Sequence, residues 1–122
     1  DYVEMQWRML QQEKPEDYVI ATGKMTSVRE FIEISAELLN WGGIEWDGTG
    51  IQEKGRRKDT GEIVVEIKSE FYRPAEVDQL LGDSSKALKK LGWKPKCDIR
   101  QLAEEMIESD KKIALNELNS KF

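Results

Sequence analysis

Arg73 and Glu76 lie three residues apart in the string Tyr-Arg-Pro-Ala-Glu-Val-Asp. Because Pro74 suits the first position of a helical turn, we expect both side chains to emerge on the same side of that turn. A guanidinium donates paired hydrogen bonds to phosphate oxygens, and a carboxylate accepts two from adjacent hydroxyl groups. The spacing therefore fits a nucleoside diphosphate, with Arg73 on the phosphates and Glu76 on the ribose. A simple ion pair between the two side chains, worth roughly 0.2–0.5 kcal/mol, fits it equally well.

A second cationic group is the string Lys-Gly-Arg-Arg-Lys at residues 54–58. A glycine beside arginines lets the backbone approach an anion while the guanidinium groups bind its oxygens. The group stands out because the whole chain is acidic, with 19 Lys and Arg against 24 Asp and Glu. A run of charges is nevertheless more often a solvated loop that aids solubility. Both interpretations remain open from the spacing alone.

The composition excludes several kinds of site. The chain has no histidine and one cysteine, Cys97, so it cannot supply a zinc finger, a Cys-x-x-Cys redox pair or a Ser-His or Cys-His nucleophile by itself. No metal site is expected. A net charge of −5 argues against nucleic acid or an anionic membrane as the main partner. Gly48-Thr49-Gly50 lacks the third glycine and the flanking strand and helix of a dinucleotide loop, so we expect no cofactor site here.

Length and hydropathy predict one globular domain over residues 1–122. With 122 residues and 39% apolar side chains, the chain can bury a core without metal or disulfide staples. No apolar run reaches the length of a membrane span, and the acidic first residues differ from a signal peptide. A single cysteine is typical of a cytoplasmic protein. The chain begins without Met in what reads as the middle of a helix, so we expect it to be a piece of a longer protein.

The periodicities predict a mixed α/β fold in which helices outnumber short strands. We expect an apolar first helix that ends at Lys14-Pro15, and a strand at residues 18–21 buried on both faces. Ser27 and Glu30 form a capping box at the start of a second helix that ends near Asn40. Two short strands, 44–46 and 63–67, flank a glycine-rich loop that holds the basic string.

The C-terminal part is predicted to be helical. A turn or short helix starts at Pro74, and another helix runs from Asp83 or Ser84 to Gly92. Asp98 caps a long last helix with an apolar stripe, and residues 116–122 are expected to fray. The four tryptophans are scattered, which favours packing over base stacking.

Seven motifs resemble, in the same order, the GDP-mannose 4,6-dehydratase family of extended short-chain dehydrogenases. They are the opening string at residues 1–12, Ile-Ala-Thr-Gly at 20–23, Ser-Val-Arg-Glu-Phe at 27–31, Gly-Arg at 55–56, Tyr-Arg-Pro-Ala-Glu-Val-Asp at 72–78, Gly-Asp-Ser-Ser-Lys-Ala at 82–87 and Leu-Gly-Trp-Lys-Pro at 91–95. The Ser-Lys-Ala and Leu-Gly-Trp-Lys-Pro segments are shared across that superfamily. The opening string and Tyr-Arg-Pro-x-Glu-Val-Asp are more specific to the dehydratases. The resemblance covers nearly the whole chain and corresponds to the C-terminal third of such enzymes.

The resemblance implies a lyase that uses NADP. Members of the family oxidise the mannose C4 hydroxyl, eliminate water across C5 and C6, and return the hydride to C6 to give GDP-4-keto-6-deoxymannose. Their cofactor loop, their Tyr-x-x-x-Lys pair and the Thr and Glu of the elimination all lie upstream of the point where this chain starts. We therefore expect no catalytic residue in this chain, no NADP binding by it, and no activity from it alone.

By the same resemblance, Arg56 and Arg73 grip the diphosphate and Glu76 the ribose, with Tyr72 beside them. For Arg57 and Lys58, a solvated loop remains the favoured interpretation. The implied fold is a C-terminal substrate-binding domain without its dinucleotide-binding Rossmann part. The implied partners are GDP-mannose, the preceding Rossmann domain and further copies of the full-length enzyme, with no nucleic acid and no membrane. The alternatives are a fragment of another nucleotide-sugar epimerase or reductase, or a small non-enzymatic interaction domain.

Overall fold

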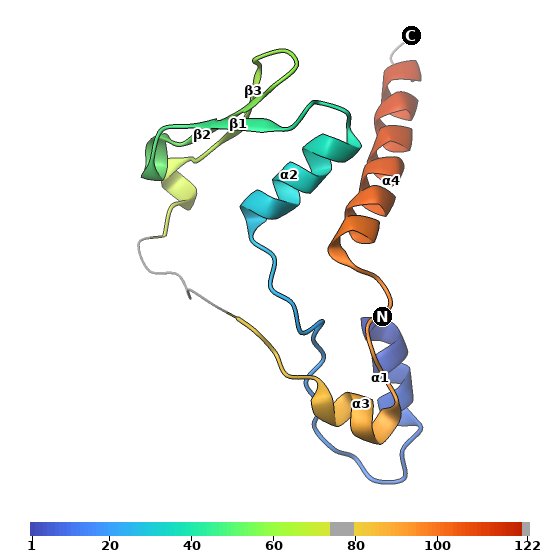
Figure 1. Cartoon of the computed structure of the whole chain (residues 1–122). Coiled ribbons are helices and arrows are strands. Elements are labelled where there is room, and N and C mark those ends of the chain that lie inside the picture. Colours follow the sequence, from blue (N-terminus) through green and yellow to red (C-terminus); the bar gives the residue numbers. More distant parts are fainter. Residues whose placement is uncertain (74–79, 121–122) are drawn as a thin grey trace. The chain divides into compact units, whose positions relative to one another are not determined.

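The computed structural model describes residues 1–73 and 80–120, which fall into two compact units (Figure 1). The first unit is formed by residues 1–26 and 77–98, and the second by residues 27–76 and 99–122. The expectation of a single domain stays a prediction. The expected mixture of helices and short strands is confirmed, since four α-helices accompany one small antiparallel sheet in the described residues. None of the described helices is long and apolar enough to cross a membrane.

The first unit is built on helices α1 (Tyr2–Leu10) and α3 (Ser85–Leu91). Its core consists of Met5 on α1, Ala87 on α3 and Trp93 just after α3, all at most 1% exposed. Trp93 therefore serves packing, as predicted from the scattered tryptophans. Four partly buried side chains surround this core: Met9, Tyr18, Ile20 and Leu91.

Helix α1 buries less of its apolar surface than its sequence pattern indicates. It ends at Leu10, one turn before the predicted Lys14-Pro15, because the Gln11 amide bonds back to the Arg8 carbonyl at 3.2 Å and the Gln12 amide to the Met9 carbonyl at 3.3 Å. Trp7 and Leu10 are 62% and 81% exposed, whereas Met5 faces the core. The apolar residues of this helix thus divide between an inner and an outer side.

The predicted strand at residues 18–21 is wrong. The segment is extended, but it belongs to no sheet of the described residues, and Val19 is 52% exposed. Its close neighbour is the segment around Gly82, where an added Cβ would lie 2.6 Å from the Ala21 Cβ. An apolar run of four residues identifies an extended segment, but it does not reveal whether strands flank it on both sides.

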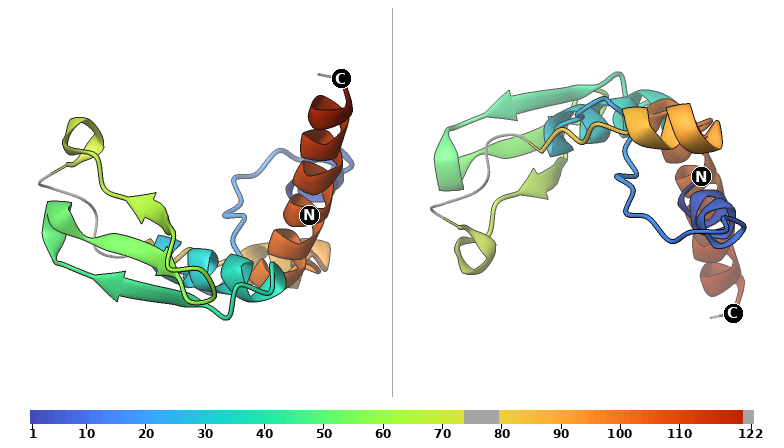
Figure 2. Two further views of the ribbon diagram at one scale, coloured as in Figure 1. Left: turned by 90° about the horizontal axis from the view of Figure 1, so that it is seen from above. Right: turned by 90° about the horizontal axis from the view of Figure 1, so that it is seen from below.

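The second unit combines helix α2 (Val28–Leu38), a three-stranded sheet and helix α4 (Ile99–Asn119). The capping role of Ser27 is confirmed, because its hydroxyl accepts a hydrogen bond from the Glu30 amide at 3.1 Å. The sheet has the order β1 (Ile44–Asp47), β2 (Lys54–Arg57), β3 (Ile63–Glu66), all antiparallel. Helix α4 packs against α2, and both views of Figure 2 show the long α4 and the curved ribbon of strands.

The middle strand β2 corrects the prediction that the basic string lies in a loop. Gly55 is buried in β2, and an added Cβ would lie 3.0–3.1 Å from side-chain atoms of Ile44, Trp46 and Val65. The glycine thus makes room for side chains of both neighbouring strands, rather than for an anion beside the backbone. Two short 3₁₀ helices, η1 (Gly50–Gln52) and η2 (Ser69–Phe71), follow β1 and β3.

The two predicted C-terminal helices are present. Gly92 ends α3 in the left-handed conformation, with φ of 60°, as expected of a glycine at that position. Helix α4 begins at Ile99, directly after Asp98, and continues to Asn119, so the predicted fraying is wrong for residues 116–119. The Ser120 amide still bonds to the Asn116 carbonyl at 3.0 Å, which holds the last turn.

Candidate functional site

Arg56 lies on the sheet face opposite to the apolar one. Because side chains alternate along a strand, Gly55 and Arg56 point to different faces, and Arg56 shares its face with Glu45, its partner in the register of β1. Its half-buried guanidinium makes one long hydrogen bond, from Nη1 to the Gly61 carbonyl at 3.4 Å. Arg56 forms no ion pair within the described residues. It is therefore a cation with hydrogen-bonding capacity to spare.

Two other side chains of the basic string, those of Arg57 and Lys54, are engaged within the fold. Arg57 binds both carboxylate oxygens of Asp59, at 3.0 and 2.7 Å, and its guanidinium stacks over the Trp41 ring at 4.4 Å. This pairing lowers the pKa of Asp59 and raises that of Arg57. Lys54 forms an ion pair with Glu66 at 3.2 Å. Of the string, Arg56 is thus better suited to an external anion than Arg57 or Lys54.

Tyr72 and Arg73 follow η2 on the surface of the second unit. Both are exposed, Tyr72 to 52%, and the Tyr72 amide closes η2 by bonding to the Ser69 carbonyl at 3.3 Å. Arg73 makes no hydrogen bond or ion pair in the described part of the chain. Glu76 and the turn predicted at Pro74 lie outside the described residues. The joint binding of a nucleoside diphosphate by Arg73 and Glu76 therefore stays a prediction.

The six arginines of the chain divide into two groups. Four have a carboxylate partner: Arg8 binds Glu4, Arg29 binds Glu53, Arg57 binds Asp59 and Arg100 binds Glu37. The other two, Arg56 and Arg73, have none among residues 1–73 and 80–120. These are the two arginines for which the sequence predicts contacts with a diphosphate. Their geometry leaves both guanidinium groups able to bind phosphate oxygens in pairs.

A second set of contacts, not foreseen from the sequence, fixes the sheet against α2. The Trp46 indole nitrogen donates to Glu33 on α2 at 2.9 Å, and Arg29 of α2 stacks over the Trp46 ring at 4.1 Å. Arg29 also pairs with Glu53, just before β2. No periodic pattern links these residues, so only the folded chain reveals that they meet. They hold β1 and β2, and thereby the strand that carries Arg56.

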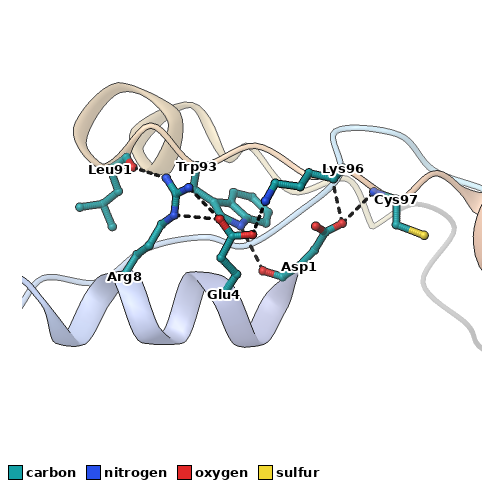
Figure 3. A network of polar contacts seen from close by, with 7 residues as sticks. All are labelled: Asp1, Glu4, Arg8, Leu91, Trp93, Lys96 and Cys97. Carbon is teal, nitrogen blue, oxygen red and sulfur yellow. Dashed lines mark hydrogen bonds and ion pairs between the residues drawn. The ribbon is translucent and has the colours of Figure 1, made fainter.

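The first unit has a charged network of its own, drawn in Figure 3. The Asp1 carboxylate accepts hydrogen bonds from the backbone amides of Lys96 and Cys97, at 3.0 and 2.9 Å. Glu4 binds Arg8 and the Lys96 amine, both at 2.7 Å. These two bonds, that from Lys96 first, lower the pKa of Glu4. The network ties α1 to the segment that follows Trp93, so its charges serve structure.

The described residues do not fit a metal ion or a dinucleotide. No group of three metal-ligating side chains is found in them. Gly48 precedes a three-residue 3₁₀ helix instead of an α-helix, and an added Cβ there would lie 2.6 Å from the Gln52 carbonyl oxygen. The backbone of this turn therefore lies too close to Gln52 to leave room for a pyrophosphate.

Comparison with known proteins gives a consistent result. Residues 1–106 match the sequence model of the family described as GDP-mannose 4,6 dehydratase. The chain is 47% identical to the GDP-mannose 4,6-dehydratase of Vibrio cholerae, an alignment that covers 93% of this chain and 33% of that protein. It is 50% identical to the GDP-mannose 4,6 dehydratases of Cricetulus griseus and Homo sapiens, over 90% of this chain and 29% of each relative. The chain thus spans about a third of the length of these relatives.

Proposed function

Because the chain belongs to the GDP-mannose 4,6-dehydratase family, we propose that it is the part of such an enzyme that binds the GDP portion of the sugar nucleotide. In this proposal Arg56 and Arg73 bind the two phosphates, Glu76 binds the ribose hydroxyls and Tyr72 lies beside them. The substrate is GDP-mannose and the product of the whole enzyme is GDP-4-keto-6-deoxymannose. The lyase class, the use of NADP, the cytoplasmic location and the assembly into homo-oligomers remain predictions.

The observation that carries the proposal is the division among the arginines. Four of the six arginines are engaged by a carboxylate within the fold, namely Arg8, Arg29, Arg57 and Arg100. Arg56 and Arg73 lack such a partner in the described residues, and Arg56 sits on a strand anchored by the packing around Gly55. A rigid strand holds a binding side chain more precisely than a loop does.

The proposed residues contribute to catalysis without touching the reacting bonds. Contacts to the nucleotide part of a substrate supply binding energy that positions the sugar for reaction. Bidentate bonds from two arginines also fix the orientation of the diphosphate, which a pair of point charges would leave free to rotate. The cofactor and the groups that move protons and hydride are assigned, in this proposal, to the part of the longer enzyme that precedes this segment.

The direct test is a calorimetric titration of the full 122-residue chain with GDP, UDP and mannose 1-phosphate. The proposal predicts that GDP binds and that mannose 1-phosphate, which lacks the nucleoside and the second phosphate, binds far more weakly. Comparable binding of UDP and GDP would favour an epimerase or reductase acting on another nucleotide sugar. Absence of binding by all three ligands would contradict the proposal and favour a non-enzymatic interaction domain.

Substitution of Arg73 gives the sharper test. Arg73→Lys keeps the positive charge but loses the planar pair of donors, so GDP binding should weaken by roughly 1–3 kcal/mol. Arg100→Lys is the matched control, because Arg100 is also an exposed arginine but is paired with Glu37 at 3.1 Å. The control should leave GDP affinity unchanged. Equal affinities of the Arg73→Lys variant and the parent chain would show that Arg73 takes no part in binding.

A further inference from the structure

Glu45 of β1 lies directly opposite Arg56 of the neighbouring strand β2. The register of β1 and β2 pairs the two residues, which places both side chains on the same sheet face. Side chains paired in this way have Cβ atoms about 4.5–5.5 Å apart, so their charged ends can interact. Glu45 is exposed, and it makes no hydrogen bond or ion pair in the described part of the chain. The carboxylate is therefore close to Arg56 but not engaged in the fold.

Other charges of this face form ion pairs, although Asp47 forms none in the described residues. Lys54, opposite Asp47 in the register, pairs with Glu66 at 3.2 Å, and Lys68 pairs with the same carboxylate at 3.1 Å. Glu45 is thus a negative charge without an ion-pair partner beside the strand arginine that we propose binds a phosphate. Any anion bound by Arg56 must approach this carboxylate.

We infer that Glu45 is a specificity-determining residue that favours a sugar-linked diphosphate over a free nucleoside diphosphate. This inference rests on the proposed function of Arg56. A terminal phosphate loses its second proton with a pKa near ~6, whereas a phosphate esterified by a sugar has no second proton to lose. Well above that pH, free GDP carries one more negative charge than GDP-mannose. Glu45 repels that extra charge and competes with it for Arg56, so the free nucleotide binds less well.

The experiment compares GDP and GDP-mannose in calorimetric titrations of the full chain at a pH well above ~6. An exposed charge pair is worth up to about 1 kcal/mol, so Glu45→Gln should lower the Kd for GDP roughly two- to fivefold. The Kd for GDP-mannose should fall by a smaller factor. The gain in GDP affinity of Glu45→Gln should shrink as salt is added, because salt screens interactions between exposed charges. A purely structural effect of the substitution would not depend on salt in this way.

Asp47→Asn is the matched control. It removes the same charge from the same face of β1, but at a position opposite Lys54 instead of Arg56. We expect it to change the ratio of the two Kd values less than Glu45→Gln does. Equal effects of the two substitutions, or an unchanged ratio in Glu45→Gln, would overturn the inference.

The variant Arg56→Gln separates this inference from the proposed function. If Arg56 binds phosphate, Arg56→Gln weakens both ligands, and adding Glu45→Gln to it recovers little of the loss. If Arg56→Gln leaves both Kd values unchanged, the assignment of Arg56 to the diphosphate fails and the role of Glu45 fails with it. If Arg56→Gln weakens binding but Glu45→Gln has no effect on the ratio, only the inference about Glu45 fails.

Discussion

At the scale of single residues, the functional question is which charges are free to meet a ligand. Arg57 and Arg56 are neighbours in the sequence, yet Arg57 is held by Asp59 and Trp41 while Arg56 has only the Gly61 carbonyl. Alternation along β2 is the cause, because adjacent side chains point to opposite sheet faces with different neighbours. The basic string thus contains one arginine that is held within the fold, Arg57, and one that is free to bind a ligand, Arg56.

Glu4 is a residue whose charge stabilises the fold, and its effect depends on pH. Its pKa lies below the ordinary value of 4.5, owing first to the hydrogen bond from Lys96 and then to that from Arg8. A lowered pKa means that the folded state favours the charged form, so this stabilisation is present above about pH 4.5 and is lost as the pH falls through the folded-state pKa. Glu4→Gln should therefore lower the urea midpoint of unfolding at neutral pH, and the difference from the parent chain should narrow in acid.

The control for this prediction is Glu105→Gln. Glu105 is an exposed residue of α4 that forms no ion pair in the described residues, and its substitution makes the same change of charge. It should have little effect on the urea midpoint at either pH. A Glu4→Gln difference that stays constant from neutral pH to well below pH 4.5 would contradict the proposed role of the Glu4 charge.

At the scale of elements, local chemistry determines where helices begin and end. Ser27 caps α2 through a bond to the Glu30 amide, and Gly92 ends α3 with a positive φ that other residues adopt at a cost. Both ends were predicted from the sequence. The end of α1 was not predicted, because no capping residue or glycine marks the last turn at Gln11.

The contribution of the Ser27 cap can be measured against a matched serine. Ser27→Ala removes the acceptor of the Glu30 amide and should lower the free energy of unfolding by about 1 kcal/mol. Ser84 occupies the corresponding position of α3 but makes no capping hydrogen bond with its side chain, so Ser84→Ala should cost less than ~0.5 kcal/mol. Urea denaturation of both variants gives the comparison. Equal losses would mean that the hydroxyl of Ser27 does not act as a cap.

At the scale of the whole molecule, the chain corresponds to about a third of each relative. Large apolar side chains such as Trp7, Leu10 and Leu118 are more than half exposed. The site that we propose is only part of an active site. It binds a nucleotide, and no group in it is assigned to proton or hydride transfer. Both features fit a segment that works together with further polypeptide.

This view predicts that the purified chain has no dehydratase activity. Incubation of the 122-residue chain with GDP-mannose and NADP should yield no GDP-4-keto-6-deoxymannose by chromatography, even where calorimetry shows that the chain binds GDP. The binding measurement on the same preparation is the control for a folded, competent sample. Turnover by this chain alone would show that it carries catalytic residues that the proposal assigns elsewhere.

The sequence by itself determined the presence of the four helices, the Ser27 cap of α2, the Gly92 end of α3, the mixture of helices and short strands, and the family. These follow from short-range spacing and from motifs of a few residues, and both are visible without knowing what lies nearby in space. It also singled out Arg56, Arg73, Tyr72 and Glu76 as candidate site residues, whose roles in binding remain predictions.

Only the tertiary structure decided which of the charges are engaged and where the strands lie. The basic string became strand β2 because Gly55 fits beneath Ile44, Trp46 and Val65, three side chains that come from two other strands. The same pairing put Glu45 opposite Arg56 and left Arg57 on the other face. Such contacts depend on register between distant segments, and no local pattern in the sequence specifies that register.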